Sequence, residues 1–265
     1  CDYVRPVPAR CPTCGEPSLK VIGVGTERIE QELLVMFPTA RVVRMDSDSL
    51  RRKGELERIM GAIRRREYDL IIGTQILSKG HDFPHITLVG ALLADVSLNL
   101  PDFRAPERTF QLLTQMAGRA GRGDLAGQVF IQTYSPEHYA LVHVSTHDPE
   151  GFTAKELAIR EAAGTPPFSS HALVWVTSEN DRAAQRQAEV LTEAFGNAAV
   201  RGVAVAGPVE APIKRIAKRF RWMVQLRAPS VGPLHAALRA VLEGDDFRLP
   251  HDVRVAVDVD PYTVF

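Results

Sequence analysis

The sequence predicts an α/β fold in which a doubly wound parallel sheet extends to about residue 145 and a small α+β domain follows. Two observations carry this prediction. Short, continuously apolar runs of the kind found in buried parallel strands alternate with segments of helical spacing. The stretch TPPF at residues 165–168 then breaks the alternation, and a second group of strands and helices begins after it.

The first half supplies the alternating elements. We expect a helix over residues 26–37, with Thr26 as its N-cap, Glu27 in its first turn and Pro38 as its end. The later helices have apolar residues at helical spacing, and the strands are short apolar runs. In order, these elements are ARVVRM (strand), KGELERIMGAIRRR (helix), YDLIIGT (strand), ITLVGALLA (strand), APERTFQLLTQMAGRA (helix) and GQVFIQTY (strand).

The second half begins with a helical connector at residues 149–166 and continues as the α+β domain at residues 167–265. Strands are predicted at 173–177, 219–227 and 253–259, and helices at 181–196 and 231–242. Asp258 and Asp260 lie at the end of the last strand. We expect a structural role for this acid pair, because the sequence offers no general-acid partner.

The amino-acid composition excludes few classes of function, but the distribution of charge is informative. The chain has 265 residues with 32 basic and 32 acidic side chains, but residues 201–227 hold seven basic residues against one acidic residue. Such a local cluster is typical of polyanion binding. No apolar run approaches the ~18 residues of a membrane span, and no signal peptide is evident. All three cysteines lie in the first 14 residues, which fits a reducing cytoplasm, and the start at Cys1 indicates a fragment or a processed piece.

The segment GTQILSKGHDFP, residues 73–84, directly follows a predicted apolar strand. Polar groups at the carboxyl end of such a strand lie where open α/β sheets bind their ligands. The segment is therefore a candidate binding loop. An ordinary polar loop between a strand and a helix is the alternative interpretation.

A second segment, QMAGRAGR at residues 115–122, ends a predicted helix. Arg119 and Arg122 are three residues apart and therefore share one helix face. A glycine directly before each arginine lets another backbone or a phosphate approach closely, and the planar guanidinium matches phosphate geometry. The alternative is a solvated helix end with two surface arginines, which the preceding candidate loop argues against.

Cys11 and Cys14 form a C-x-x-C pair followed by glycine, which is half of a structural zinc site. A redox role is less well supported, because no βαβ pattern surrounds the pair. A tetrahedral zinc site needs two further ligands.

The segment IKRIAKRFRWMVQL, residues 213–226, interleaves basic and aromatic residues. This composition suits single-stranded or branched DNA, which it can bind through phosphate contacts and base stacking. The alternative is an edge strand with a solvated basic face, in which Phe220 and Trp222 face the core. The candidate DNA contacts are Lys214, Arg215, Lys218 and Arg221.

GTQILSKGHDF and QMAGRAGR resemble motifs V and VI in the second lobe of superfamily 2 helicases. With CPTCG, GVGTERIEQEL, RMDSDSLRRKGELE, DFRAPERTFQLL, QTYSPEH, PPFSSHALV, RFRW and DVDP, they resemble the PriA family of primosomal replication-restart helicases along the whole chain. The resemblance implies a RecA-like helicase lobe 2 at residues 21–148. It also implies the end of a zinc-binding insert at residues 1–20.

By this resemblance, ATP and Mg²⁺ are held mainly by a first lobe, whose phosphate loop is absent from this sequence. The chain alone is therefore not expected to hydrolyse ATP. The implied catalytic residues, which match the motif near the γ-phosphate, are Arg119, Arg122 and Gln115. The implied nucleotide contacts are Lys79, Gly80 and Asp82, and the implied contacts to the DNA backbone are Thr74 and Gln75.

The resemblance also implies zinc. In this family a cysteine-rich insert with eight cysteines holds two zinc ions. Cys11 and Cys14 match one of these sites and Cys1 matches the other, so both Zn²⁺ sites are expected to be incomplete in this chain.

The implied activity is that of a 3′-to-5′ DNA helicase that recognises stalled forks and D-loops and starts primosome assembly for replication restart. The implied partners are forked and single-stranded DNA, single-stranded-DNA-binding protein, and primosome proteins such as PriB and DnaT or the machinery that loads the replicative helicase. Arg219 matches the arginine that receives the acidic tail of single-stranded-DNA-binding protein, but Met223 stands where many relatives have glutamine. A non-catalytic scaffold that binds forks and recruits partners is the alternative from another function class.

Overall fold

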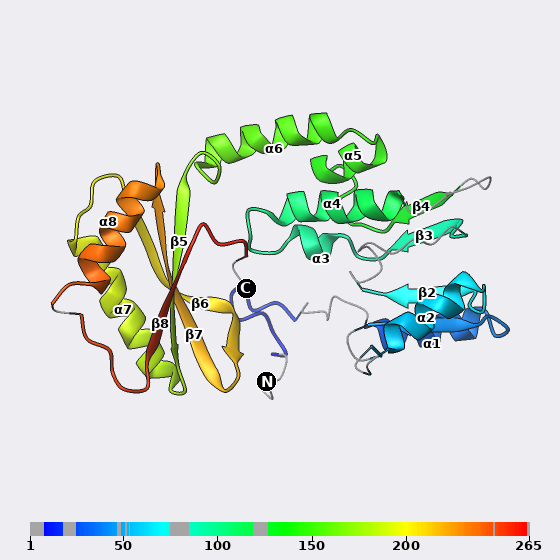
Figure 1. The fold of residues 1–265 in the computed structure, drawn as a ribbon, viewed down its shortest axis with the longest axis horizontal. Coiled ribbons are helices and arrows are strands. Elements are labelled where there is room, and N and C mark those ends of the chain that lie inside the picture. The colour runs from blue at the N-terminus through cyan, green and yellow to red at the C-terminus, as the bar shows by residue number, and fades with distance from the viewer. Residues whose placement is uncertain are drawn as a thin grey trace. The chain divides into compact units, whose positions relative to one another are not determined.

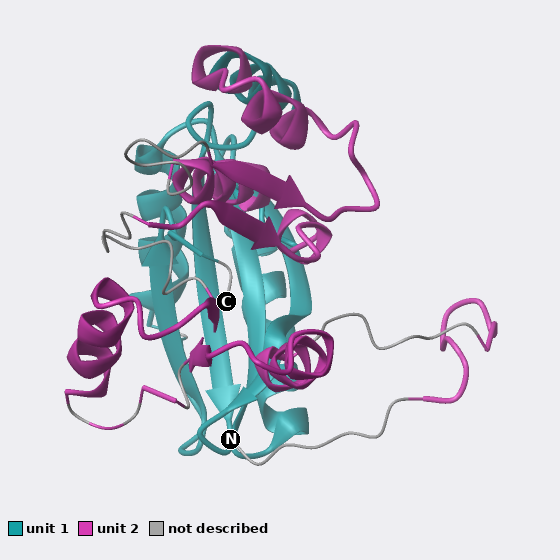
Figure 2. Cartoon of the chain, turned by 90° about the vertical axis from the view of Figure 1, so that its right-hand side faces the viewer, with its two compact units in different colours: residues 1–7, 101–104, 153–265 teal, residues 8–100, 105–152 magenta. Residues whose placement is uncertain are grey.

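The computed structural model of the protein describes residues 8–17, 25–46, 49–50, 52, 54–74, 85–118, 127–245 and 247–263. The chain divides into two compact units (Figure 2). The N-terminal unit comprises residues 8–100 and 105–152, and the C-terminal unit includes residues 101–104 and 153–265.

The N-terminal unit contains two pairs of parallel strands with helices between them. Its elements are α1 (Thr26–Met36), β1 (Val42–Met45), α2 (Glu55–Arg64), β2 (Leu70–Gly73), β3 (Leu88–Ala91), α3 (Asp95–Leu98), α4 (Ala105–Ala117), β4 (Gln128–Ile131) and α5 (Tyr139–Ser145). β1 pairs with β2, and β3 pairs with β4, both in parallel. This pairing confirms the predicted α/β class. Among the described strands the two pairs are separate ladders, so a single doubly wound sheet stays a prediction.

Each strand pair has its own apolar core, built from the helical faces that the sequence predicted. Met45 of β1 is fully buried and packs with Ile59 of α2. Around β3 and β4, Phe110 of α4 packs with Leu141 and Val144 of α5. α5 and the one-turn helix α3 were not predicted, because helices of seven and four residues are too short to show a repeated apolar spacing.

The start of α1 corrects the prediction that Thr26 is an N-cap. The N-cap is Gly25, and Thr26 is the first helical residue. The Thr26 hydroxyl instead donates a 2.6 Å hydrogen bond to Oδ2 of Asp46, which directly follows β1. This bond, followed by the bond from the Ser49 backbone N–H, lowers the pKa of Asp46 to about 2. The threonine therefore ties α1 to the end of β1.

Thr26→Val is expected to destabilise the N-terminal unit by about 1 kcal/mol at pH 7, because the Asp46 carboxylate loses its hydroxyl donor. The wild-type Asp46 pKa of about 2 lies below the unfolded value of about 3.9. Its stabilisation is therefore full above about pH 4 and is lost as the pH falls towards 2. Urea unfolding between pH 7 and pH 2 should show the deficit shrinking over this range. A constant deficit would contradict the assignment, and Thr39→Val, at an exposed position, is the control.

The C-terminal unit is an antiparallel sheet with two helices on one face (Figure 1). It is entered through α6 (Pro149–Ala163) and contains β5 (Ser170–Ser178), α7 (Asp181–Asn197), β6 (Ala204–Ile216), β7 (Arg219–Ala228), α8 (Val231–Leu242) and β8 (Arg254–Val259). The strand order is β6-β7-β5-β8. Val174 of β5 and Val224 of β7 are fully buried and belong to one core with Leu191 of α7 and Leu234 of α8. Asp260 Oδ1 accepts a bond from the His171 N–H at 3.0 Å, which confirms a structural role at this strand end.

The sequence analysis missed most of β6, which joins β7 in a hairpin. The strand contains Pro208 and Pro212, and its register with β7 shifts between Ala206 and Val209 and again between Glu210 and Arg215. β6 tolerates prolines because it is an edge strand of the sheet. The basic segment 213–226 is therefore not one strand but the end of β6, a turn and most of β7.

Candidate nucleotide and nucleic-acid sites

Most of the predicted nucleotide contacts fall in the two segments of sequence that follow β2 and α4. Residues 75–84 and 119–126 lie outside the described residues, and so do these predicted site residues: Gln75, Lys79, Gly80, Asp82, Arg119 and Arg122. Their immediate neighbours are described. Thr74 follows the end of β2 and Gln115 lies in the last turn of α4, and both are exposed. The first segment thus follows the carboxyl end of a parallel strand, where α/β folds bind ligands.

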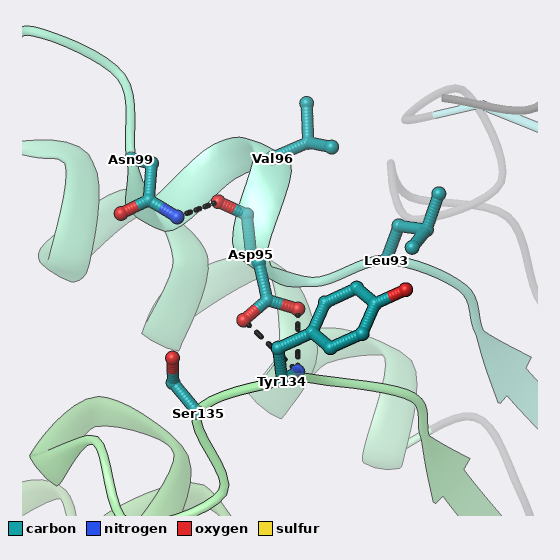
Figure 3. Close-up of a pocket in the computed structure, with 6 residues that line it drawn as sticks. All are labelled: Leu93, Asp95, Val96, Asn99, Tyr134 and Ser135. Atoms are coloured by element: carbon teal, nitrogen blue, oxygen red, sulfur yellow. Dashed lines mark hydrogen bonds between the residues drawn. The ribbon is translucent and has the colours of Figure 1, made fainter. Parts of the chain in front are cut away.

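A pocket of about 250 Å³ lies beside the carboxyl ends of β3 and β4 (Figure 3). It is lined by Leu93, Asp95, Val96, Asn99, Tyr134 and Ser135. The Asp95 carboxylate accepts bonds from the Tyr134 N–H at 3.0 Å and from the Thr133 hydroxyl at 2.9 Å. Burial opposes its ionisation, but these bonds outweigh burial and lower the pKa of Asp95. The ionised carboxylate therefore holds the loop after β4 against α3.

The rest of this pocket is mainly apolar and open. The Tyr134 side chain is 82% exposed, and Val96 is 50% exposed. Leu93 has a left-handed backbone with φ 54°, which is uncommon for a residue other than glycine. An exposed aromatic ring beside apolar side chains can stack on a planar ligand. This pocket was not predicted. The sequence signal that could have indicated it is the polar residues that follow two apolar strands, such as Asp95 after β3 and Ser135 after β4.

Lys214, a predicted DNA contact near the end of β6, is engaged in two ion pairs. Its Nζ lies 2.7 Å from Glu210 Oε1 and 3.0 Å from Asp181 Oδ2. Hydrogen bonds to Glu210 and then to Asp181 raise the pKa of Lys214. Two carboxylates compensate its charge, which disfavours a direct phosphate contact at this position.

The aromatic residues of the basic segment are also occupied. Trp222 packs against the core below α7 and α8, and its Nε1 donates to Asp181 Oδ1 at 2.9 Å. The alternative in which Trp222 faces the core is therefore confirmed. The Arg215 guanidinium lies 4.8 Å from the ring centroid of Phe220. Neither Trp222 nor this stacked pair presents a free ring to a base.

The other face of the sheet, turned away from α7 and α8, carries a row of cations. Residues paired across strands share a face, and Thr177 of β5 pairs with both Arg221 of β7 and Arg254 of β8. The Arg221 guanidinium lies 4.3 Å from the ring centroid of Trp175. Burial lowers the pKa of Arg221, yet an arginine stays charged in proteins. We name this surface the arginine face; its residues are Trp175, Thr177, Arg219, Arg221 and Arg254.

Arg219, the predicted partner contact, is positioned on the arginine face by main-chain acceptors. Its Nη2 donates to the carbonyl oxygens of Thr177 at 2.9 Å and Asp252 at 2.6 Å. Carbonyl acceptors orient a guanidinium without cancelling its charge. Lys218 is exposed in the turn that precedes Arg219 and has φ 66°. Trp175 and Arg254 were not predicted, because only the strand register places Trp175 against Arg221 and places Arg254 on the other side of Thr177.

Cys11 and Cys14 form a tight turn. The Gly15 N–H donates to the Cys11 carbonyl and the Cys11 N–H donates to the Glu16 carbonyl, both at 2.9 Å. The backbone N–H of Cys14, and then that of Thr13, lowers the pKa of the Cys11 thiol. A thiolate held by backbone N–H groups fits a zinc ligand. Within the described part of the chain, no group of three or more His, Cys, Asp or Glu side chains is placed to hold a metal ion, so the turn supplies half a site.

None of the helices among the described residues combines the length and the apolar character that crossing a membrane requires.

The model of the helicase conserved C-terminal domain matches residues 21–124, and that of the primosomal protein N C-terminal domain matches residues 161–262. The replication restart protein PriA of Bacillus subtilis (strain 168) is 40% identical over 263 residues, which are 99% of this chain and 33% of that protein. PriA of Synechocystis sp. is 39% identical over 264 residues, 100% of this chain and 31% of that protein. PriA of Treponema pallidum is 39% identical over 264 residues, 100% of this chain and 40% of that protein.

The chain thus spans between about a third and two fifths of the length of these relatives. The helicase match contains the elements from α1 to α4 and ends before β4, and the primosomal match contains the whole β5–β8 sheet. The match to curated relatives extends over essentially the whole chain. The chain belongs to the PriA family of replication restart proteins.

Proposed function

We propose that this chain forms the second motor lobe and the C-terminal domain of an ATP-dependent 3′-to-5′ DNA helicase. The whole protein would recognise stalled forks and D-loops and start primosome assembly. One observation carries the proposal: the sequence QMAGRAGR, with its paired arginines, begins at Gln115 in the last turn of α4 and lies inside the region that matches the helicase C-terminal domain.

The proposed chemistry divides between two lobes. Arg119 and Arg122 stabilise the charge that develops on the transferred phosphoryl group, and Gln115 belongs to the same motif. Lys79, Gly80 and Asp82 contribute further nucleotide contacts from the loop after β2. The sequence has no G-x-x-x-x-G-K-[ST] phosphate loop, so this chain alone does not hydrolyse ATP under this proposal. Bound Mg²⁺ would neutralise phosphate charge, mainly in the other lobe.

The proposed DNA contacts are of two kinds. Thr74 and Gln75, after β2, touch the backbone of the strand on which the motor moves. The arginine face supplies the second contact, with Arg221 and Arg254 for phosphates and Trp175 as a ring beneath a guanidinium. The support for this surface is that its cations lack carboxylate partners at salt-bridge distance in the described structure, whereas Lys214 has two.

The proposal also includes protein partners and zinc sites. Arg219, held by two carbonyl oxygens, presents its charge to the acidic tail of single-stranded-DNA-binding protein. Primosome proteins such as PriB and DnaT, or the machinery that loads the replicative helicase, are further partners. Cys11 and Cys14 hold a structural Zn²⁺ together with ligands from outside the described residues, and Cys1 belongs to a second zinc site.

The alternative is a scaffold that binds forks and recruits partners without hydrolysing ATP. The proposal is tested by measuring ATP hydrolysis by the full-length protein with and without forked DNA. A helicase motor should show hydrolysis that rises strongly when forked DNA is added. Fork binding without DNA-stimulated hydrolysis would instead establish the scaffold.

A further inference from the structure

The pocket beside the carboxyl ends of β3 and β4 has a rigid frame. Asp95 Oδ1 accepts from the Thr133 hydroxyl at 2.9 Å, and Asp95 Oδ2 accepts from the Tyr134 N–H at 3.0 Å. The Ser135 N–H donates to Thr133 Oγ1 at 3.0 Å. The backbone of residues 133–135 is therefore tied to the start of α3 before any ligand binds.

The accessible side chains of this pocket are mainly apolar. The Tyr134 ring is largely exposed although its backbone is fixed, and Val96 is half exposed. Leu93, which also lines the pocket, has a backbone in the left-handed region, and backbone strain of this kind is concentrated at functional sites. A tyrosine on a fixed backbone loses little conformational entropy when a planar group stacks on its ring. The pocket is therefore suited to stacking.

The polar groups of the pocket are mainly hydrogen-bond acceptors. Asn99 Nδ2 donates to the main-chain carbonyl oxygen of Asp95 at 2.9 Å, so Asn99 Oδ1 is turned away from that bond (Figure 3). The Ser135 hydroxyl can accept as well as donate. None of the six described residues that line the pocket is Lys, Arg or His. The pocket thus suits a ligand with an amino group and disfavours a phosphate or a carboxylate.

The size of the pocket restricts the ligand to a single ring system. Its volume of about 250 Å³ lies below the roughly 300–1,000 Å³ of pockets that enclose drug-sized ligands. Because Tyr134 and Val96 are exposed, a ring can enter while it is still attached to a longer chain. An unpaired DNA base is planar and arrives in this way. Adenine, guanine and cytosine also carry an exocyclic amino group, whereas thymine has none.

An arginine side chain of a protein partner is the main alternative ligand, because a guanidinium is also planar and carries N–H donors. The Asp95 carboxylate, however, is buried and already accepts from the Thr133 hydroxyl and the Tyr134 N–H. A cation that entered the pocket would give up its hydration beside a carboxylate whose charge is already compensated, whereas a neutral base would not. The apolar surface and the compensated carboxylate therefore favour the base.

We propose that this pocket receives one unpaired base of a single DNA strand, which stacks on Tyr134 and is bound more tightly when it carries an amino group. The inference rests on the proposed function, which brings DNA to this unit. Thr74, a proposed backbone contact, follows β2 in the same unit as the pocket. In the doubly wound sheet predicted from the sequence, the carboxyl ends of the strands share one edge. Backbone contacts bind any sequence, and the pocket adds discrimination between bases.

The first test measures the affinity of the full-length protein for short oligodeoxycytidylate and oligodeoxythymidylate. The wild type should prefer the cytosine strand. Tyr134→Ala should weaken cytosine binding by roughly tenfold, as expected for the loss of one stacked base, and should remove the preference. The salt dependence should stay unchanged, because no phosphate contact is lost.

The controls for this test are two further variants. Tyr134→Phe keeps the ring and should bind like the wild type. Tyr262→Ala removes a tyrosine that is 76% exposed, close to the 82% of Tyr134, and should also bind like the wild type. Equal affinity of Tyr134→Ala and the wild type overturns the inference, and so does a wild type that binds neither oligonucleotide.

The second test locates the base by NMR of the methyl-labelled 265-residue chain. Oligodeoxycytidylate should shift the methyl signals of Leu93 and Val96, because a stacked base carries a ring current. The methyl signals of Leu191, which is buried in the core of the C-terminal unit, should stay in place. L-argininamide is the competing probe. Shifts of Leu93 and Val96 with L-argininamide but not with the oligonucleotide would show a site for a cationic side chain and overturn the inference.

The pocket inference and the proposed function can fail separately. If the full-length protein shows DNA-stimulated ATP hydrolysis but the Leu93 and Val96 methyl signals do not respond to the oligonucleotide, the pocket inference alone is overturned. If these signals respond but the full-length protein does not hydrolyse ATP, the motor is overturned, and the pocket stands as a base-binding site of a scaffold.

Discussion

Full-length protein that carries Arg122→Ala is expected to bind forked DNA as tightly as the wild type and to lose DNA-stimulated ATP hydrolysis. The reason is electrostatic. Phosphoryl transfer spreads negative charge over the equatorial oxygens of the γ-phosphate, and an arginine brought to these oxygens is worth about 10³–10⁵ in rate in related NTPases. Steady-state hydrolysis at saturating forked DNA, with fork affinity measured by anisotropy, tests both halves of this result.

The control variant for Arg122→Ala tests whether charge alone is sufficient or the planar guanidinium is needed. Arg122→Lys keeps a positive charge but loses the planar fork, so it should recover only a small part of the activity. Arg119→Ala should resemble Arg122→Ala, because both arginines belong to one motif. Normal hydrolysis in Arg122→Ala would remove the motif from the active site and would favour the scaffold.

The double variant Arg221→Ala/Arg254→Ala is expected to weaken the binding of full-length protein to single-stranded or forked DNA and to reduce its salt dependence. Each phosphate contact that is lost lowers the slope of log K against log salt by about 0.7–0.9. Two contacts therefore lower the slope by roughly 1.5, and affinity should fall most at low salt. Titrations at four or more salt concentrations measure the slope directly.

The matched control for this pair is Arg182→Ala/Arg186→Ala, which removes two exposed arginines from α7 on the opposite side of the same sheet. It changes net charge by the same amount and should leave the slope unchanged. Equal losses in both double variants would mean that DNA senses only net charge. An unchanged slope in Arg221→Ala/Arg254→Ala would show that the arginine face does not contact DNA.

The parts of the fold that the sequence predicted are those whose signal is local. α7 and α8 were placed to within a residue, because each has an apolar face at helical spacing and α7 has Asn180 as an N-cap whose side chain accepts from the Ala183 N–H. β6 was largely missed, because two prolines and two register shifts remove any regular alternation. Thr26 was misassigned for a related reason: its partner, Asp46, lies 20 residues away.

The candidate site residues also divide into those with a local sequence signal and those brought together only by the fold. Motif residues such as Arg122 follow from a pattern within eight residues of chain, and a pattern of that kind can be found without a fold. Trp175 contacts Arg221, and Arg254 shares a face with it across Thr177, only through the pairing of three strands. The compensation of Lys214 by Asp181 depends on where α7 packs. Charge clusters in a sequence therefore show where cations are, but the fold decides which of them are available to a phosphate.

Residues 101–104 belong to the C-terminal unit, and the Phe103 ring contacts His171 and Arg160 there, which limits how this chain can be divided and recombined. A piece that starts at residue 153 has the whole β5–β8 sheet but lacks the ring that His171 and Arg160 contact. An exchange of C-terminal domains between relatives would likewise separate Arg104 from the carbonyl of Pro261. The part of the chain that must be exchanged together is therefore larger than residues 153–265. Hybrid proteins should retain function only when residues 101–104 and the C-terminal domain come from the same parent.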